Sequence, residues 1–424
     1  MKRITQKLNI QMKDILIDTV DAIVIGAGTI GTATAWHLAK RGLKKVVLIE
    51  RNTIGSGNTS KAASLMTLVR TKEELIPLIQ ETYKNIDEIE TLTGELTGRN
   101  KVGTLHIASS EESVKNLENI VAIANKHHIK NKEISIEEVK EKAPWISTSA
   151  IKKTSFMEDD SYVDAYLLAN AFAKAAKMEG AVIMQHTEVL ELLSEDNEIT
   201  GVKTSKGIIK SPVIIDAAGC WSNLLSLQLN IPIPMAAVRS IYWITESINT
   251  LFPKNHPMVV MPDAMAYSRP ENGALLFGLR EENSPHFHPK ELNPQPNSDF
   301  LGAKDDEWDI LEKYGKEFIN YFPQFEEIGM KNCITGISTY TPDGYYTVGT
   351  FPNFKGFYAA TGCAGCGVAG SGGIGRLVAE MVLKIPLYAN SEVFRIDRFT
   401  NFDPHSESFR QRCADARSKK KDGG

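Results

Sequence analysis

The feature that most constrains this sequence is a glycine-rich segment near the N-terminus, IGAGTIG at residues 25–31. The apolar run 22–25 precedes it, and residues 32–41 that follow have the composition of a helix. A second apolar run, 46–49, ends directly before Glu50. A strand, a glycine turn, a helix and a second strand within about thirty residues predict a βαβ unit that binds a dinucleotide.

Each glycine of this motif has a separate task. Gly26 permits the tight turn, Gly28 lets the backbone approach a pyrophosphate, and Gly31 allows close packing of helix and strand. Because the amides at the start of the helix receive the phosphates, Thr29 and Ile30 are also expected cofactor contacts. Glu50 is placed to accept hydrogen bonds from a ribose, and its charge disfavours the 2′-phosphate of NADP. The motif alone does not separate FAD from NAD.

The rest of the composition excludes several classes of protein. A chain of 424 residues predicts two or three domains. The net charge of −4 gives no electrostatic reason to expect a nucleic-acid partner. The basic N-terminus lacks the apolar segment of a secretory signal, and no run approaches the ~18 apolar residues of a transmembrane helix. Five irregularly spaced cysteines predict a reducing, cytoplasmic setting.

Four later segments carry further signals, and their order along the chain is specific. With IGAGTIG and Glu50, they resemble the D-amino-acid-oxidase-like superfamily of FAD enzymes over about residues 20–390. Within it, the sarcosine, dimethylglycine, glycine and proline oxidases and dehydrogenases are most similar. The segments are GSGNTS (55–60), VIIDAAGCW (213–221), TPDGYYTVG (341–349) and YAATGCAGCGVAGSGGIGRLVAEMV (358–382).

The resemblance implies an α/β fold in which a Rossmann-like FAD-binding domain of the glutathione-reductase type carries a second, α+β substrate domain on a mixed or antiparallel sheet. The FAD-binding domain is expected to be discontinuous, with the substrate domain inserted and extensions at both ends. The expected boundaries are 18–75, 160–236 and 335–395 for the FAD-binding domain, 76–159 and 237–334 for the substrate domain, and 1–17 and 396–424 for the extensions.

The resemblance also resolves the cofactor as FAD and implies further contacts along the chain. These expected contacts are Arg51, Gly57, Asn58, Thr59, Ser60, Val189, Ala218, Gly219, Trp221, Gly365, Cys366, Gly367 and Val368. Some relatives attach FAD through a cysteine shortly before the TPD motif. Gly336 stands at that position and Cys333 is three residues away, so non-covalent FAD is expected.

Seven of the fifteen residues in 361–375 are glycine. We expect a glycine-rich loop that passes the flavin and enters a helix near Gly373, with the helix over 374–383. Backbone amides and a helix N-terminus there would stabilise the negative charge of reduced flavin. Cys363 and Cys366 have the spacing of a zinc knuckle or a redox pair. Zinc would need a second ligand pair, and no second CxxC exists, so no metal is expected. We prefer small residues lining the flavin loop, with a dithiol switch left open.

Substrate contacts are harder to predict because the family's carboxylate anchors are missing. Where relatives have a histidine, a lysine and an arginine, this chain has Cys366, Ala369 and Ser338. We therefore expect contacts from strands of the second domain that face the flavin. The candidates are Arg239, Tyr242, Tyr267, Arg269 and Tyr340, with Arg280 and Lys61 as weaker ones. Strand alternation places Arg239 and Tyr242 on opposite faces, whereas Tyr267 and Arg269 share one.

The resemblance implies oxidation of the C–N bond of a small amine, N-methyl amino acid or imino acid, with oxygen or another acceptor reoxidising the flavin. Two alternatives stay open. One is a flavin enzyme for a 2-hydroxy acid or glycerol phosphate. The other is a flavin-bearing β-type subunit of a hetero-oligomeric amine dehydrogenase. The sequence leaves both homo- and hetero-oligomers open.

Overall fold

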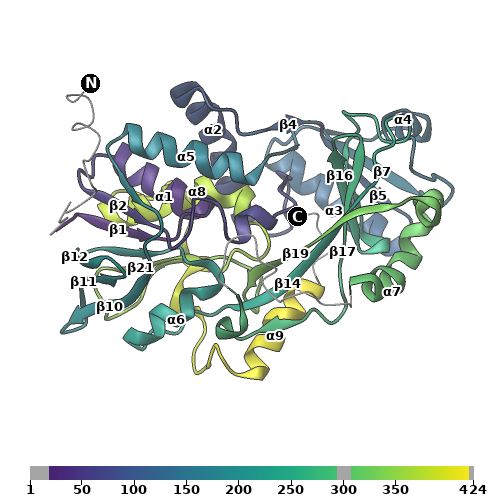
Figure 1. The fold of residues 1–424 in the computed structure, drawn as a ribbon. Helices are drawn as coiled ribbons and strands as arrows, with labels where there is room; N and C mark the ends of the chain where they lie inside the picture. The colour runs from purple at the N-terminus through teal and green to yellow at the C-terminus, as the bar shows by residue number, and fades with distance from the viewer. Residues whose placement is uncertain (1–18, 294–306, 420–424) are drawn as a thin grey trace, which may run out of the picture.

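A computed structural model describes residues 19–293 and 307–419 (Figure 1). The βαβ unit lies at the centre of a six-stranded sheet with the order β20-β21-β13-β1-β2-β9. All neighbouring strands are parallel except β20 and β21. The strands are β1 (Ala22–Ile25), β2 (Val46–Ile49), β9 (Val182–Met184), β13 (Ile214–Asp216), β20 (Thr347–Thr350) and β21 (Phe357–Thr361). Three distant parts of the chain thus build one sheet.

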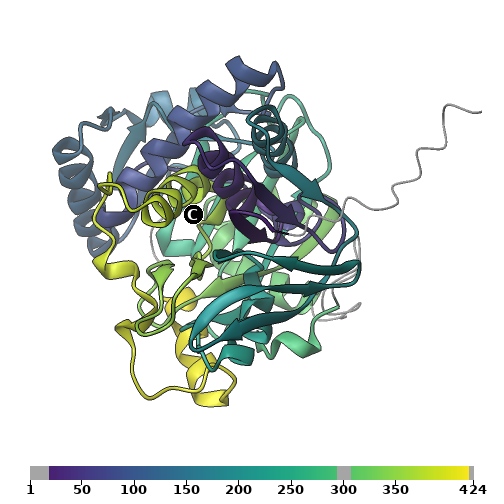
Figure 2. The same ribbon diagram turned by 90° about the vertical axis from the view of Figure 1, so that its left-hand side faces the viewer.

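Two different layers cover this sheet (Figures 1 and 2). Val24 and Leu48 point into a core with the helices, while Ile23 and Val47 pack against a three-stranded antiparallel sheet. Both strands are therefore apolar at every position, as is typical of parallel strands buried on both faces. The helices are α1 (Thr29–Lys40), α2 (Ile76–Thr93), α5 (Ala165–Met178) and α8 (Gly367–Leu383), and the small sheet comprises β10 (Val189–Glu195), β11 (Glu198–Thr204) and β12 (Gly207–Lys210).

A second, nine-stranded mixed sheet occupies the other side of the molecule (Figure 1). Its pairs are antiparallel except β15 with β5. Helix α7 (Glu307–Ile319) packs on it through an aromatic core that includes Phe277, Phe318 and Phe322. The strands are β5 (Thr104–Ala108), β6 (Asn131–Lys132), β7 (Lys153–Met157), β14 (Ala236–Thr245), β15 (Met258–Met261), β16 (Ala266–Glu271), β17 (Ala274–Leu279), β18 (His286–Phe287) and β19 (Met330–Tyr340). The fold is therefore of the mixed α/β kind.

The remaining elements are short or peripheral. Three two-residue strands, β3 (Leu65–Met66), β8 (Ser161–Tyr162) and β4 (Asn100–Lys101), form a small sheet. The other helices are α3 (Glu111–Lys126), α4 (Ile136–Lys142), α6 (Ser222–Ser226), α7 (Glu307–Ile319) and α9 (Glu407–Ser418). No helix in the described ranges is both long and apolar enough to cross a bilayer. The expected domain boundaries remain a prediction, although α2, expected in the substrate domain, packs in the core of α1 and α8.

The late glycine cluster corrects one expectation. Helix α8 begins at Gly367, seven residues before the expected start at 374. Most glycines of 361–375 thus lie inside a helix rather than in a loop. Glycine weakens an isolated helix, which is why the sequence suggested a loop. Packing explains them instead: a Cβ on Gly373 would lie 2.6 Å from the carbonyl carbon of Leu78, and one on Gly375 would lie 2.7 Å from that of Ala33.

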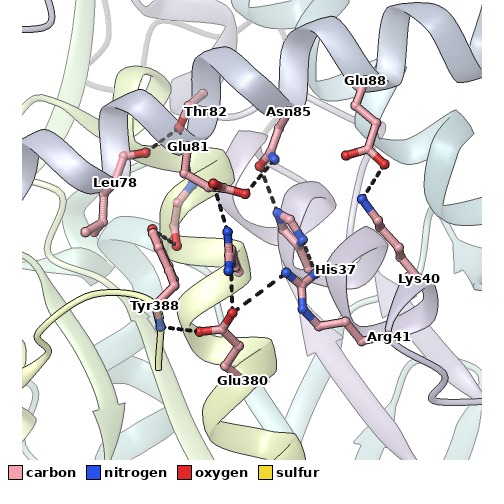
Figure 3. Close-up of polar contacts among 12 residues, drawn as sticks. His37, Lys40, Arg41, Leu78, Glu81, Thr82, Asn85, Glu88, Glu380 and Tyr388 are labelled. Atoms are coloured by element: carbon pink, nitrogen blue, oxygen red, sulfur yellow. Dashed lines mark hydrogen bonds and ion pairs between the residues drawn. The ribbon is translucent and has the colours of Figure 1, made fainter. Parts of the chain in front are cut away.

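A polar network crosses this tight interface of α1, α2 and α8 (Figure 3). The backbone N–H groups of Gly372 and Gly373 donate to Thr82 Oγ1 at 3.0 and 3.3 Å. His37 is buried on α1, and its Nε2 lies 2.8 Å from Asn85 Oδ1. Burial and the nearby Arg41 charge hold the pKa of His37 well below its ordinary value. His37 is thus a packed, neutral side chain that takes no part in the lining of the cavity described below.

Candidate functional site

A cavity of 490 Å³ runs between the two sheets and includes the glycine turn after β1. At one end it is lined by Gly26, Gly28 and Gly31, and at the other by Tyr242, Tyr267 and Tyr340 from the nine-stranded sheet. The 3-10 helix Asn58–Lys61 and the start of α8 lie along it. One hollow therefore connects the βαβ turn with the residues predicted to hold a substrate.

Two glycines of the turn stand where no side chain fits. Gly26 has φ +97°, and a Cβ there would lie 2.6 Å from the carbonyl oxygen of Ala217. A Cβ on Gly31 would overlap the carbonyl oxygen of Gly26. The backbone of this turn consequently lines the cavity directly and directs the N-terminus of α1 toward it, the arrangement that binds phosphates.

Glu50 is held in a fixed orientation at the end of β2. Its Oε2 accepts a hydrogen bond from the Ala27 N–H at 2.8 Å, and its Oε1 accepts one from the Asn52 N–H at 2.9 Å. The guanidinium of Arg51 stacks on the Trp221 ring at 3.9 Å and borders the same part of the cavity. A ribose hydroxyl could donate to the remaining acceptor sites of the carboxylate.

The structure brings nearly all predicted cofactor contacts to this cavity. Gly26, Gly28, Thr29, Ile30, Gly31, Glu50, Arg51, Gly57, Asn58, Thr59, Val189, Ala218, Gly219, Trp221, Gly365, Cys366, Gly367 and Val368 all line it. Ser60 does not; its hydroxyl donates to the carbonyl oxygens of Ser56 and Gly57 instead. A serine hydroxyl in a loop can donate either to a ligand or to a nearby backbone carbonyl, and the sequence alone does not distinguish the two.

Two of the five substrate candidates lie outside the cavity lining. Arg239 is buried and its Nη2 pairs with Glu281 Oε1 at 2.5 Å. Arg269 donates from Nε to the Ala63 carbonyl oxygen at 2.6 Å and from Nη1 to Glu271 at 2.6 Å. Arg269 and Tyr267 do share a strand face, as predicted, but only Tyr267 lines the cavity.

Two arginines complete the tyrosine end. Arg280, a weaker candidate in the sequence, follows β17 and lines the cavity. Arg417 of α9 also lines it and was missed, because the C-terminal segment carries no motif and was read as an extension. The carboxylates among the described lining residues are Glu50 and Glu188, and both lie at the opposite, βαβ end.

Cys363 and Cys366, which have the spacing of a metal-binding or redox pair, lie at the cavity. Cys363 and Cys366 both line the cavity and are not joined by a disulfide. Thr339 Oγ1 donates to Cys363 Sγ at 3.4 Å. Within residues 19–293 and 307–419, no group of three or more His, Cys, Asp or Glu side chains is arranged to hold a metal ion.

Asp216 is the last residue of β13, next to Ala217 in the cavity lining. Its burial leads us to expect that stability depends on pH. Burial raises its pKa to about 6, although the Ala218 N–H and the Ser222 hydroxyl donate to its Oδ1 at 3.0 and 2.8 Å. Because the folded pKa exceeds the ordinary 3.8, the stabilising contribution of protonated Asp216 is complete below pH 3.8 and is lost as pH rises through about 6.

We therefore expect Asp216→Asn to remove this decline. Relative to the native protein, the free energy of unfolding of the variant should rise by on the order of 2 kcal/mol between about pH 4.5 and pH 7. Urea unfolding at several pH values measures the difference. Asp160, whose pKa burial also raises to about 6, is present in both proteins and cancels. A pH-independent difference between the two proteins would contradict the assignment.

The chain is similar to known flavin-dependent oxidoreductases in sequence and in fold. A family model described as "FAD dependent oxidoreductase" matches residues 21–381. The mitochondrial sarcosine dehydrogenase of Homo sapiens is 28% identical over 87% of this chain, and the chain spans only 40% of that protein. The glycine oxidase of Bacillus subtilis is 28% identical, with 89% of this chain and 97% of that protein covered. The crystal structure of L-proline dehydrogenase from P. horikoshii has a TM-score of 0.79 at 27% identity, covering 90% of this chain and 98% of the other.

Proposed function

Since the chain belongs to the family of FAD-dependent oxidoreductases, we propose that it oxidises the C–N bond of a small amine, N-methyl amino acid or imino acid. The observation that carries this proposal is the single cavity that runs from the glycine turn and Glu50 to three tyrosines and two arginines. The sarcosine, glycine and proline enzymes among its relatives support this substrate class.

The described residues fit the cofactor. The glycine turn at Gly26–Gly31 would hold the pyrophosphate, and Glu50 the adenosine ribose. Asn58, Thr59 and Gly365–Val368 would hold the ring system, within a Rossmann-like unit of the glutathione-reductase type. Gly336 leaves no cysteine at the linking position of some relatives, so we infer that FAD is held without a covalent bond.

When bound, FAD supplies the acceptor for the hydride that leaves the carbon next to the substrate nitrogen. A C=N bond forms as the hydride leaves, and a primary or secondary amine also loses its N–H proton. Water hydrolyses the resulting imine or iminium ion to an amine and a carbonyl compound. The protein's task is to hold that carbon in place and to keep the amine neutral. No carboxylate among the described residues lines the tyrosine end, so no negative charge from the lining favours the ammonium form of the amine there.

The tyrosines are suited to orient the substrate as hydrogen-bond donors. Burial raises the pKa of both Tyr242 and Tyr267 above the ordinary value of 10.0. Both hydroxyls therefore stay protonated at neutral pH. Tyr242, Tyr267 and Tyr340 come from three different strands of one sheet, so their positions are fixed by its pairing.

The substrate class is tested by anaerobic mixing of the FAD-loaded protein with sarcosine, dimethylglycine, glycine, proline and a set of 2-hydroxy acids. We expect bleaching of the flavin absorption band by one or more of the amines, with release of the corresponding amine or aldehyde. Bleaching by hydroxy acids alone would instead support a 2-hydroxy-acid dehydrogenase. Admitting air afterwards distinguishes an oxidase from a dehydrogenase.

Glu50 provides a direct test of the cofactor's orientation. Glu50→Gln removes the negative charge of the carboxylate that would accept a hydrogen bond from the ribose. Each carboxylate oxygen accepts a hydrogen bond from a backbone N–H, and the substitution turns one of these oxygens into an amide NH₂ group that cannot accept. We expect the Kd for FAD to rise about 10-fold or more, the usual effect of losing a hydrogen bond to a charged group. Fluorescence titration measures it. The control is Glu191→Gln. Glu191 is an exposed residue of β10 that forms an ion pair with Lys203, and its substitution should leave the Kd for FAD unchanged.

A further inference from the structure

The tyrosine end of the cavity lacks the carboxylate anchors of the family's amino-acid enzymes. Ser338 and Ala369 stand where some relatives have an arginine and a lysine, and both line the cavity. Neither side chain carries a charge that could pair with a carboxylate. If the substrate is an amino acid, another part of the chain must supply that charge.

The C-terminal helix α9 reaches this end of the cavity from outside the matched family region of residues 21–381. Phe409, Cys413 and Ala414 bury one face of the helix against Tyr340 and Ala364. Figure 1 shows α9 beside β14. Arg417 follows Cys413 by four residues, so it lies on the same buried face one turn further along. The position of Arg417 is therefore set by the packing of the helix.

Arg417 is only 5% exposed, and its described contacts leave much of the guanidinium available. Nη1 donates to Ser284 Oγ at 2.5 Å. The nearest carboxylate oxygen, Oε2 of Glu281, is 4.0 Å away, and Glu281 is already in a close pair with Arg239 at 2.5 Å. An arginine carries five N–H donors in a rigid fork that matches a carboxylate.

Two arginines line the cavity together with Tyr267, and both of their charges act on its hydroxyl. Burial raises the pKa of Tyr267, and the charges of Arg417 and Arg280 are the largest influences that oppose this rise. Arg417, Arg280 and Tyr267 all line the cavity, and no described acidic residue lines this end. Cations and hydroxyl donors converge here as they do in sites that bind a carboxylate.

We propose that Arg417, together with Arg280, binds the carboxylate of the substrate, so that the C-terminal helix determines specificity for amino acids over simple amines. This inference rests on the proposed oxidation of a C–N bond. Arg417 is thereby a binding residue supplied by a segment that the family match does not include. It replaces the charge missing at Ser338 and Ala369.

The test uses the full-length, FAD-loaded protein with propionate as the probe and propionamide as its uncharged counterpart. Binding is followed by the perturbation of the flavin absorption spectrum, which requires no turnover. Arg417→Gln should raise the Kd for propionate about 10- to 100-fold and leave that for propionamide unchanged. Arg417→Lys, which keeps the charge, should recover part of the affinity. Arg412→Gln, an exposed arginine on the same helix, is the matched control and should bind propionate as the native protein does.

Each outcome separates the inference from the proposed function on which it rests. A native protein that binds FAD and is reduced by amines, but whose affinity for propionate is absent or is the same in Arg417→Gln, would overturn the carboxylate site alone. A native protein that neither holds FAD nor is reduced by any amine would overturn the proposed function itself. Equal weakening of propionate and propionamide, including in Arg417→Lys, would show a structural role for Arg417 and would also refute the proposal.

Discussion

Replacement of Gly31 by alanine is expected to yield a protein that no longer retains FAD. The new Cβ would overlap the carbonyl oxygen of Gly26 and lie 3.4 Å from the Cβ of Ala217. Gly26 cannot retreat, because its own position at φ +97° is bounded by the Ala217 carbonyl. The turn between β1 and α1 must therefore open, and its amides move away from the pyrophosphate they would bind.

Overpacking typically costs about 1–3 kcal/mol and occasionally more, and we expect the upper part of this range here because backbone rather than a flexible side chain must move. FAD recovered per chain after gel filtration measures the loss, and circular dichroism reports whether the chain still folds. Gly315→Ala is the control, because Gly315 lies in α7, outside the cavity lining, and this variant should retain FAD. Full retention of FAD by Gly31→Ala would show that the turn does not bind the cofactor as described.

The second large effect is expected at Gly373, in the middle of α8. Alanine normally stabilises a helix by about 1 kcal/mol relative to glycine. Here the added Cβ would overlap the backbone of Leu78 on α2, and it would lie 2.6 Å from the carbonyl carbon. Neighbouring groups cannot adjust easily, because the N–H of Gly373 donates to Thr82 and its carbonyl accepts from the Tyr388 hydroxyl at 2.9 Å.

We therefore expect Gly373→Ala to lower the free energy of unfolding by about 3 kcal/mol or more, opposite in sign to the helix-propensity effect. Urea denaturation measures it. Gly315→Ala in α7 is the matched helical control, since its Cβ would meet the edge of the Phe325 ring at 3.0 Å, which a small ring movement can relieve. A stabilised Gly373→Ala protein would contradict the packing role of the glycines in α8.

The two glycine clusters show which parts of the structure can be predicted from the sequence. The first cluster was interpretable because its strand, turn and helix are local, and each glycine has a role defined by its neighbours in sequence. The second was misread as a loop because the partners of Gly373 and Gly375 are Leu78 and Ala33, hundreds of residues away. A glycine-rich segment with low helix propensity can still form a stable helix when its glycines let the backbones of neighbouring helices pack closely.

The substrate end shows the same limit. Strand alternation correctly separated Arg239 from Tyr242, but it could not tell that Glu281 holds Arg239 away from the cavity. Arg417 had no signal in the sequence, because only the packing of α9 on Tyr340 brings it to the site. Long-range contacts thus decide which of several arginines can meet a substrate, whereas the cofactor turn is encoded locally.

The most direct test of the central claim is the FAD content of the purified protein and its fate on acid denaturation. The two glycine-lined segments beside one cavity predict one FAD per chain, all of it released into solution when the protein precipitates. A colourless chain that does not take up added FAD, or FAD that stays attached to the precipitate, would contradict a non-covalent cofactor site between Gly26–Gly31 and Gly365–Val368.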